Sequence, residues 1–410
     1  MVYKIIAAAA LVLVFIYNLV IKIMGWKSGD RPVPECVSDV YDPETYLKRK
    51  QYNAEKSRHS IFALCVTLVI ELALLLSNAY AAFASLFPDN DYLRLIAVVL
   101  LMTLSSIPVI PFEYYDTMVI EAKYGFNRTS KKTFWIDQIK NFIISVILTT
   151  GIAIILMLIH KALGDWLILV FAGVMVLFVL AITFLFPVLS KIFNKFKPLE
   201  EGELRTKLIE MLEKHGYKVR DIKVMDASRR TTKSNAYFTG FGKMKTIVLY
   251  DTLVEAMEPD EICAVFAHEM GHGLHKDTLK NQIITVFQML IIGVLAWLTL
   301  RNPDIFTAFG FDRINYGFAV LLIMTVEFAL ISPLFMLIAN TVSRKAEYRA
   351  DEQAVKEGYA EQLVSALKKL ARQNFSDLSP HPALVLLEYS HPTLAQRVEA
   401  IEKLSKENKK

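Results

Sequence analysis

The sequence predicts a mainly α-helical protein that crosses a membrane several times and carries a small β-sheet in one of its polar segments. Of its 410 residues, 54% are hydrophobic, and the mean hydropathy is +0.37. That composition is too apolar for a soluble globular chain of this length. Runs of about twenty apolar residues, long enough to cross a bilayer as helices, recur along the chain. Between residues 191 and 281 the pattern becomes polar, with short strand-like runs.

Seven apolar runs are predicted to form membrane-spanning helices. They lie near Ile5–Met24, Ile61–Leu86, Leu93–Pro111, Phe142–Ile159, Trp166–Leu189, Ile283–Leu300 and Tyr316–Ala339. The first run follows Lys4, as the apolar part of a signal peptide would, but no small-residue cleavage site follows it. We therefore expect this helix to be retained.

Lysines and arginines are distributed unevenly between the two sides of the predicted membrane. Seven spans place residues 25–60, 113–141, 190–281 and the C-terminal tail on one side, and these segments hold most of the basic residues. The positive-inside rule then puts them in the cytoplasm and the N-terminus outside. The net charge of +5 mostly reflects this asymmetry. The lysines are dispersed among glutamates and form no aromatic-basic stripe, which argues against a nucleic-acid partner.

The spans and polar segments divide the chain into four predicted parts. Residues 1–190 form an N-terminal membrane block of five spans, and residues 191–281 form a cytoplasmic catalytic segment. Residues 282–340 form a transmembrane hairpin, and residues 341–410 form a C-terminal catalytic segment.

The 191–281 segment is expected to contain both helices and strands. It begins with an amphipathic helix that ends near Gly216. Strands are predicted at Asp221–Met225, Ala236–Phe241 and Thr246–Tyr250, with a hairpin turn between the last two. Pro259 suits the first turn of the next helix, which is predicted to run without a break from Asp260 to Leu300.

That last helix carries a metal-binding motif. His268, Glu269 and His272 form an HExxH motif, HEMGH, and residues four apart share one helix face, so both imidazoles can hold one Zn²⁺. Glu269 then faces the open coordination position, where it can act as a general base toward water. The alternative is a chance occurrence, but the flanks of AVFAHEMGHGLH, apolar before the motif and small after it, are typical of a buried helix. The motif predicts a zincin-like metalloprotease with one zinc ion per chain.

Two histidines leave zinc one protein ligand short, and Glu347 is the best candidate for the third. It lies in SRKAEYRADEQAV just after the seventh span, which returns the chain to the side of the motif. Asp351, one turn further along the same face, is placed to orient a histidine ligand. The alternative is an ordinary charged helix in which Glu347 pairs with Arg344. None of the three cysteines has zinc-ligand spacing, and Cys263 is expected to pack in a core.

Two further segments could assist a peptidase. His391 and Arg397, in YSHPTLAQR, could donate to the oxyanion that forms when a peptide carbonyl is attacked. The alternative is a surface histidine before a capped helix. The run SNAYFTGF could be an edge strand that pairs with an extended peptide, with Asn235 at its catalytic end, or it could be a plain strand.

These motifs, in this order, resemble those of the type I CAAX prenyl proteases, which are seven-span zinc metalloendopeptidases. The resemblance is carried by HEMGH, SNAYFTGF, KTIVLYDTLV, AEYRADEQA and SHPTLAQR. In the N-terminal half, EAKYGFNRTS and FPVLSKIFNKFKPLEEGEL agree with the same family, so the resemblance covers nearly the whole chain.

The resemblance implies a role for each candidate residue. It implies that His268, His272 and Glu347 bind zinc and that Glu269 is the general base. It also implies that Asp351 supports a ligand from behind and that Asn235 and Ala236 line the substrate edge. The residues expected to assist the transition state are His391 and Arg397.

The resemblance further implies that the seven helices surround a water-filled chamber capped by the soluble segments. Glu71 and Glu327 lie well inside apolar runs, where an unpaired carboxylate is costly, so each is expected to face a cavity or to pair with another helix. The C-terminal SKENKK shows no evident dilysine retrieval signal, which fits a prokaryotic member. The expected location is a bacterial inner membrane, or the endoplasmic reticulum membrane for a eukaryotic chain.

The leading hypothesis is a membrane zinc endopeptidase that cleaves near the C-terminus of prenylated (CAAX) or otherwise membrane-associated proteins. Its partners would be the peptide or protein substrate and the lipid bilayer. The main alternative is a quality-control zinc protease for membrane proteins without prenyl dependence, although such proteases usually have fewer spans. A non-catalytic scaffold would have no chemical need for Glu269, and a transporter would not need HExxH beside ExxxD.

Overall fold

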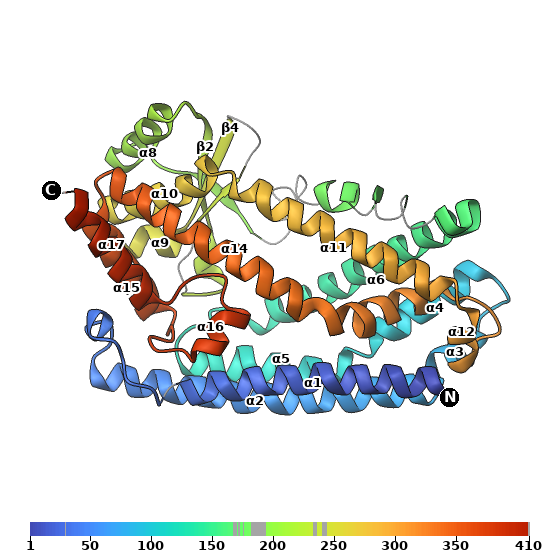
Figure 1. Ribbon diagram of the computed structural model, residues 1–410. Coiled ribbons are helices and arrows are strands. Elements are labelled where there is room, and N and C mark those ends of the chain that lie inside the picture. The colour runs from blue at the N-terminus through green and yellow to red at the C-terminus, as the bar shows by residue number, and fades with distance from the viewer. Residues whose placement is uncertain are drawn as a thin grey trace.

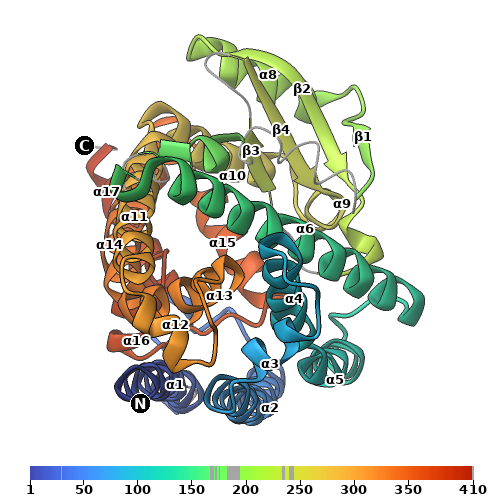
Figure 2. The ribbon, with the colours of Figure 1, turned by 90° about the vertical axis from the view of Figure 1, so that its right-hand side faces the viewer.

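The structure, a computed structural model, describes residues 1–28, 30–166, 170, 173–174, 176–181, 194–232, 236–239 and 244–408. Long helices make up most of it, and a smaller α/β portion lies at one end of them (Figure 1). Seen from the other end, the long helices are arranged in a ring (Figure 2). The predicted fold class, a mainly α-helical polytopic membrane protein with a small sheet, is confirmed.

Six helices among the described residues are long and apolar enough to cross a membrane. They are α1 (Val2–Ser28), α2 (Pro43–Leu76), α4 (Asp91–Leu104) continued through α5 (Ile110–Tyr115) to Glu121, α6 (Lys131–Leu163), α11 (Asp277–Leu300), and α13 (Tyr316–Leu321) continued into α14 (Ala329–Lys356). They correspond to six of the seven predicted spans. The fifth predicted span, Trp166–Leu189, falls largely outside the described residues.

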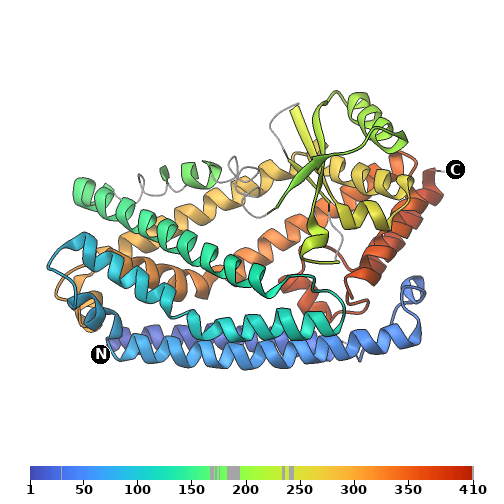
Figure 3. The same cartoon turned by 180° about the vertical axis from the view of Figure 1, so that it is seen from behind.

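The boundaries predicted for the second span, Ile61–Leu86, are wrong. Helix α2 begins at Pro43, where the Asp42 side chain accepts a hydrogen bond from the Thr45 backbone N–H at 2.9 Å. The helix ends at Leu76, and Asn78 takes a left-handed conformation with φ 60° before α3 (Ala79–Ser85). Apolar residues flank the Ser77–Asn78 break on both sides, so the mean hydropathy of a twenty-residue window does not detect the break. Helices α1 and α2 lie side by side along one face of the bundle (Figure 3).

Two membrane helices contain a π-helical turn, at Asp116–Glu121 and at Leu322–Phe328. Such wide turns are frequent at functional positions because they redirect the side chains that they carry. The second turn contains Glu327, whose Oε1 accepts a hydrogen bond of 2.6 Å from the Thr299 hydroxyl on α11. For Glu327 the expectation of a partner on another helix is therefore confirmed.

The polar segment carries a four-stranded sheet with the order β1-β2-β4-β3. Its strands are β1 (Phe196–Pro198), β2 (Lys218–Met225), β3 (Ala236–Thr239) and β4 (Met244–Tyr250). Strands β2 and β4 are parallel, and β3 pairs with β4 in the antiparallel sense that a hairpin requires. The three predicted strands are confirmed, whereas the three-residue β1 was not predicted. The predicted turn at residues 240–243 lies outside the described residues.

Shorter helices pack around the sheet and the end of the bundle next to it. They are α8 (Glu203–Lys214), α9 (Asp251–Ala256), α10 (Pro259–Leu274), α15 (Ala360–Gln373), α16 (Pro382–Glu388) and α17 (Leu394–Asn408). Helix α12 (Pro303–Ala308) lies at the opposite end of the bundle (Figure 1). Helix α10 starts with a capping box between Glu258 and Glu261. It packs against α8, α14 and α15, and every residue from Ile262 to His268 is buried. Cys263 lies in this core, as predicted.

The prediction of one unbroken helix from Asp260 to Leu300 is wrong. Helix α10 ends at Leu274, Lys276 takes a left-handed conformation with φ 54°, and α11 starts at Asp277. The turn brings the Asp277 carboxylate, which is only 5% exposed, back beside His272. The break is therefore stabilised by a contact with the HExxH motif and not by a helix-breaking residue.

Candidate metal centre

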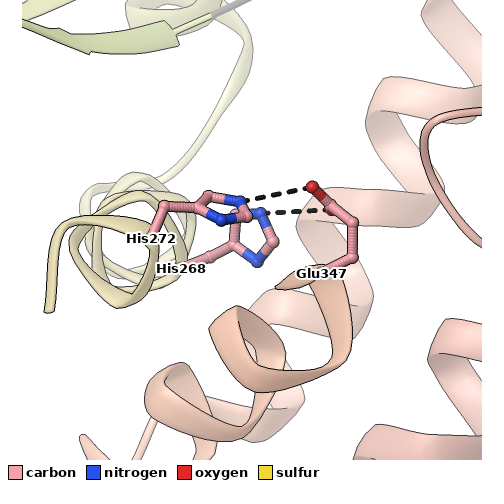
Figure 4. Close-up of side chains that lie close together, drawn as sticks. All are labelled: His268, His272 and Glu347. Atoms are coloured by element: carbon pink, nitrogen blue, oxygen red, sulfur yellow. Dashed lines mark ion pairs between the residues drawn. The ribbon is translucent and has the colours of Figure 1, made fainter. Parts of the chain in front are cut away.

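Three side chains from two helices meet at one point of the structure. His268 and His272 come from α10 and Glu347 from α14, and one ligand atom of each lies within 4.8 Å of the others. Figure 4 shows both imidazole rings facing the carboxylate. Nε2 of His268 is 3.5 Å from Glu347 Oε2, and Nε2 of His272 is 3.2 Å from Glu347 Oε1. The structure thus brings together the three residues that the sequence suggested as metal ligands.

A glycine sets the distance between the two ligand-bearing helices. A Cβ atom on Gly271 would lie 2.8 Å from the Ala350 Cα, which is too close for a real contact. Helices α10 and α14 therefore approach at a point where neither residue has a bulky side chain. His272 directly follows the glycine, so the close approach places its ring within reach of Glu347.

Each histidine turns its Nε2 toward Glu347 and its Nδ1 toward a different carboxylate. Nδ1 of His268 lies 2.8 Å from Asp351 Oδ1, and Nδ1 of His272 lies 3.2 Å from Asp277 Oδ2. Because an ionised carboxylate can only accept, each Nδ1 must carry the donated proton. This arrangement leaves the Nε2 lone pair of each neutral ring free for a metal ion.

Asp277 has this role without having been predicted from the sequence. Its Oδ1 also accepts hydrogen bonds from Arg349 at 2.8 Å and from Lys280 at 2.9 Å. An acidic residue five positions after the second motif histidine was a visible signal. It was missed because a continuous helix would have carried Asp277 away from the histidine face.

Arg397 lies behind the ligands. Its Nε and Nη2 donate to the two oxygens of Asp351 at 2.9 and 2.6 Å, and its Nη1 is 3.3 Å from Glu347 Oε2. The side chain is buried, with the whole residue 8% exposed. Its contacts therefore tie α17 to both carboxylates of the ExxxD motif on α14.

Glu347 itself indicates that the site fits a metal ion. The residue is 5% exposed, and its Oε2 is buried without accepting a hydrogen bond from any described residue. Arg397 Nη1 lies 3.3 Å from this oxygen without a hydrogen bond to it, so the oxygen still has lone pairs to offer a metal ion. Two imidazole nitrogens and one carboxylate oxygen form a donor set suited to zinc and to other first-row divalent ions.

The electrostatics of the site also favour bound positive charge. Burial lowers the pKa of His272, but the neighbouring carboxylates of Glu347, Glu269 and Asp277 outweigh it and raise that pKa to about 9. Burial raises the pKa of the Glu269 carboxyl, and the charges of the two histidines oppose this shift. Glu269 is thus a carboxylate with increased proton affinity beside the ligand cluster, as a general base requires.

His391 reaches the same cluster from its exposed side. Its Nε2 lies 3.4 Å from Glu347 Oε1, and its side chain is 61% exposed. The preceding backbone is held by Arg344, which donates to the carbonyls of Val385 at 3.0 Å and Tyr389 at 2.7 Å. Arg344 is therefore occupied with the backbone before His391, and Glu347 is a buried residue, so the alternative of a solvated Arg344–Glu347 pair is excluded.

The two residues expected to line the substrate edge differ in what the structure describes. Ala236 begins β3, pairs with Leu249 of β4, and lies at the end strand of the described sheet. Strand β3 is also in contact with α10, which carries the motif. Asn235 lies outside the described residues.

Comparisons with known proteins place the chain in a family. Residues 22–195 match the family described as CAAX prenyl protease N-terminal, five membrane helices, and residues 198–405 match peptidase family M48. The CAAX prenyl protease 1 homolog of Arabidopsis thaliana is 34% identical over 90% of both chains. CAAX prenyl protease 1 of Saccharomyces cerevisiae is 31% identical over 93% of this chain and 91% of its own length.

A solved structure agrees with this over almost the whole chain. The crystal structure of S. mikatae Ste24p superposes with a TM-score of 0.90 at 28% sequence identity, covering 98% of this chain and 99% of that one. With its metal-binding cluster and its membrane helices, the chain belongs to peptidase family M48, as an integral-membrane metallopeptidase of the type I CAAX prenyl protease group.

Proposed function

We propose that this metallopeptidase works with one zinc ion held by His268, His272 and Glu347. The supporting observation is the buried Oε2 of Glu347, which accepts no hydrogen bond from the described residues and faces two histidines whose Nδ1 atoms are already engaged. Two histidines, one glutamate and an open position form a known ligand set of catalytic zinc. Zinc bound there would polarise the scissile carbonyl and make water more acidic.

Glu269 is the general base in this proposal. It takes a proton from the attacking water and passes it to the leaving amine, and its raised pKa brings both transfers closer to neutral pH. His391, on the exposed side of Glu347, donates to the oxyanion. Arg397 stabilises the site from behind, because its bonds to Asp351 orient His268.

The substrate in this proposal is an extended peptide near the C-terminus of a prenylated protein. Its backbone pairs with β3, the end strand of the described sheet, with Asn235 and Ala236 at the catalytic end. The name of the relatives, CAAX prenyl protease 1, supports the prenylated class. The ligand helices α10 and α14 adjoin or continue membrane-length helices, so a lipid-anchored chain end in the bilayer lies near the site.

The membrane arrangement belongs to the same proposal. Residues 1–190 form the membrane block around a chamber, 282–340 the hairpin, and 191–281 with 341–410 the two catalytic segments. Both catalytic segments face the cytoplasm, because the basic residues are concentrated on their side.

The test uses purified full-length protein, wild type beside Glu269→Ala. Zinc content is measured by mass spectrometry, and cleavage is followed with a farnesylated C-terminal peptide and its unprenylated twin. We expect one zinc ion in both proteins and cleavage of the farnesylated peptide by the wild type alone. Chelation should abolish cleavage and added zinc should restore it.

Other outcomes separate the parts of the proposal. Equal cleavage of both peptides would leave the peptidase and remove the prenyl requirement. Zinc without cleavage of either peptide would favour a quality-control protease, with unfolded membrane proteins as the next substrates. Protein that binds no zinc would overturn the metal site.

A further inference from the structure

Glu71 is the second carboxylate inside an apolar run, and it faces a cavity. The cavity has a volume of about 220 Å³ and lies between α1, α2, α3, the end of α4 and the helix formed by α13 and its π-helical turn. We propose that it binds a protonated primary amine on a short alkyl chain, with the Glu71 carboxylate as the counter-ion. This site is separate from the metal centre, since none of the lining residues belongs to that centre.

The polar lining comes from four elements. Thr67 and Glu71 are four residues apart on α2 and therefore share one helix face. Tyr80 on α3, Ser105 at the end of α4 and Thr325 in the π-helical turn line the other sides. One carboxylate and several hydroxyl groups thus line the same cavity, among residues that are otherwise apolar.

Most of these hydroxyl groups have already donated their proton. Thr67 donates to Ala63 O at 3.0 Å, and Thr325 donates to Leu321 O at 2.7 Å. The serines do the same within their own segment, Ser105 to Met102 O and Ser106 to Thr103 O, both at 2.7 Å. Each of these oxygens can therefore only accept from a ligand.

Four of the five hydroxyl groups in the lining have donated within their own segments, and the fifth, that of Tyr80, shares a hydrogen bond with Ser105, so the lining offers mainly acceptors to a ligand. The carboxylate adds further acceptor positions, and an unpaired carboxylate at membrane depth is costly. A ligand that offers several N–H donors and one positive charge satisfies both conditions, and an alkylammonium group has three such donors. One carboxylate balances one charge, so a divalent ion is disfavoured.

The apolar part of the lining suits the alkyl chain. Leu11, Ile70, Met102, Leu321 and Val326 complete the wall. An amine with a stem of a few carbons can place its methylene groups against these side chains while the ammonium reaches Glu71. A bare metal ion would leave most of the space and this apolar surface unused.

The test measures binding to the full-length protein in detergent. The probe is n-butylammonium, with n-butanol as its neutral analogue and sodium chloride as a matched source of a small cation. We expect butylammonium alone to raise the unfolding temperature, and Glu71→Gln to weaken its binding about tenfold or more, as expected when a charged hydrogen-bond partner is removed. The matched control is Glu327→Gln, which alters the other intramembrane carboxylate, already bonded to Thr299, and should leave binding unchanged.

Three outcomes would overturn the proposal. If sodium chloride raises the unfolding temperature as much as butylammonium does, the cavity is a site for a small metal cation. If butanol raises it as much, the binding is only apolar. No shift with any probe would show that Glu71 is a protonated acid without a ligand. If Glu71→Gln does not fold, Thr325→Val removes one acceptor and should still weaken binding.

A second arm distinguishes a free amine from a lysine side chain, and it rests on the proposed peptidase function. Binding of a peptide with one lysine is compared with binding of its norleucine twin, using the Glu269→Ala protein so that no cleavage is required. A preference for lysine that disappears with Glu71→Gln would assign the site to substrate recognition. Equal binding of the two peptides, with butylammonium still bound, would assign it to free amines.

Discussion

His272 and Asp277 lie on different helices, yet His272 Nδ1 is 3.2 Å from Asp277 Oδ2. The left-handed turn at Lys276 makes this contact possible within five residues of sequence. Both motif histidines therefore have a carboxylate behind them, Asp351 for His268 and Asp277 for His272. The metal centre is symmetric in this respect, although one carboxylate comes from α14 and the other from the start of α11.

Replacing Asp277 is expected to weaken metal binding. The Asp277→Asn protein can present its amide nitrogen to His272 and favour the wrong tautomer, so zinc affinity should fall about 10- to 100-fold. The measurement is chelator competition, with circular dichroism to verify the fold. Lys280→Met is the control, because it removes one partner of Asp277 and keeps the carboxylate. Unchanged zinc affinity in Asp277→Asn would show that the contact is only structural.

The sequence predicted the metal ligands more readily than their supports. His268 and His272 are fixed by helical spacing, and Glu347 by a hairpin that returns the chain to the same side. Asp277 was missed because its position depends on a turn that contains no proline or glycine. For Arg397 the sequence predicted a role in the transition state but not its contacts with Asp351 and Glu347.

In the fold, too, some features could be predicted from the sequence and others could not. Membrane helices can be predicted from the sequence because the surrounding lipid requires them to be apolar. Six of the seven predicted spans have a counterpart in the described residues. The break at Asn78 was missed because two polar residues, Ser77 and Asn78, barely lower the hydropathy of the apolar run that contains them. For Glu71 and Glu327 the sequence left two alternatives, a cavity or a partner on another helix. In the structure Glu71 lines a cavity, and Glu327 pairs with a residue of another helix.

Enlarging Gly271 is expected to separate the two ligand helices. The new Cβ of Gly271→Ala would meet the Ala350 Cα at 2.8 Å, so α10 and α14 must shift apart, at a cost of about 1–3 kcal/mol in the free energy of unfolding. Zinc affinity should fall as well, because His272 follows the glycine directly. Gly151→Ala in α6 is the control, since a Cβ there meets nothing within 4 Å. Equal behaviour of the two variants would contradict this account of the packing.

Glu261 is expected to make stability depend on pH. Burial raises the pKa of its carboxyl, but hydrogen bonds from Lys369 and Ser365, both 2.6 Å, outweigh burial and hold that pKa below its ordinary value of 4.5. A lowered pKa stabilises the fold above pH 4.5, and this contribution is lost as the pH falls through the folded-state pKa.

Glu261→Gln should therefore destabilise the protein by about 1–3 kcal/mol at neutral pH, the usual contribution of hydrogen bonds to a charged group. Below the ordinary glutamate pKa the difference from wild type should shrink. Denaturant unfolding at neutral and acidic pH measures both effects. A difference that stays constant across this range would mean that shape and not charge matters at this position.

The ion pair of Arg49 with Asp377 is expected to stabilise the contact between the start of α2 and the C-terminal segment. It is 0% exposed, and its Nη2 is 2.9 Å from Asp377 Oδ1. Asp377→Ala would leave a buried guanidinium without its counter-charge and should cost about 3–5 kcal/mol in unfolding free energy.

The double variant Arg49→Met with Asp377→Leu removes both charges and should recover most of that loss, because the desolvation penalty disappears with the pair. Thermal unfolding of Arg49→Met, Asp377→Leu and the double variant that combines them gives the coupling energy. Additive losses would show that the ion pair does not join the two segments.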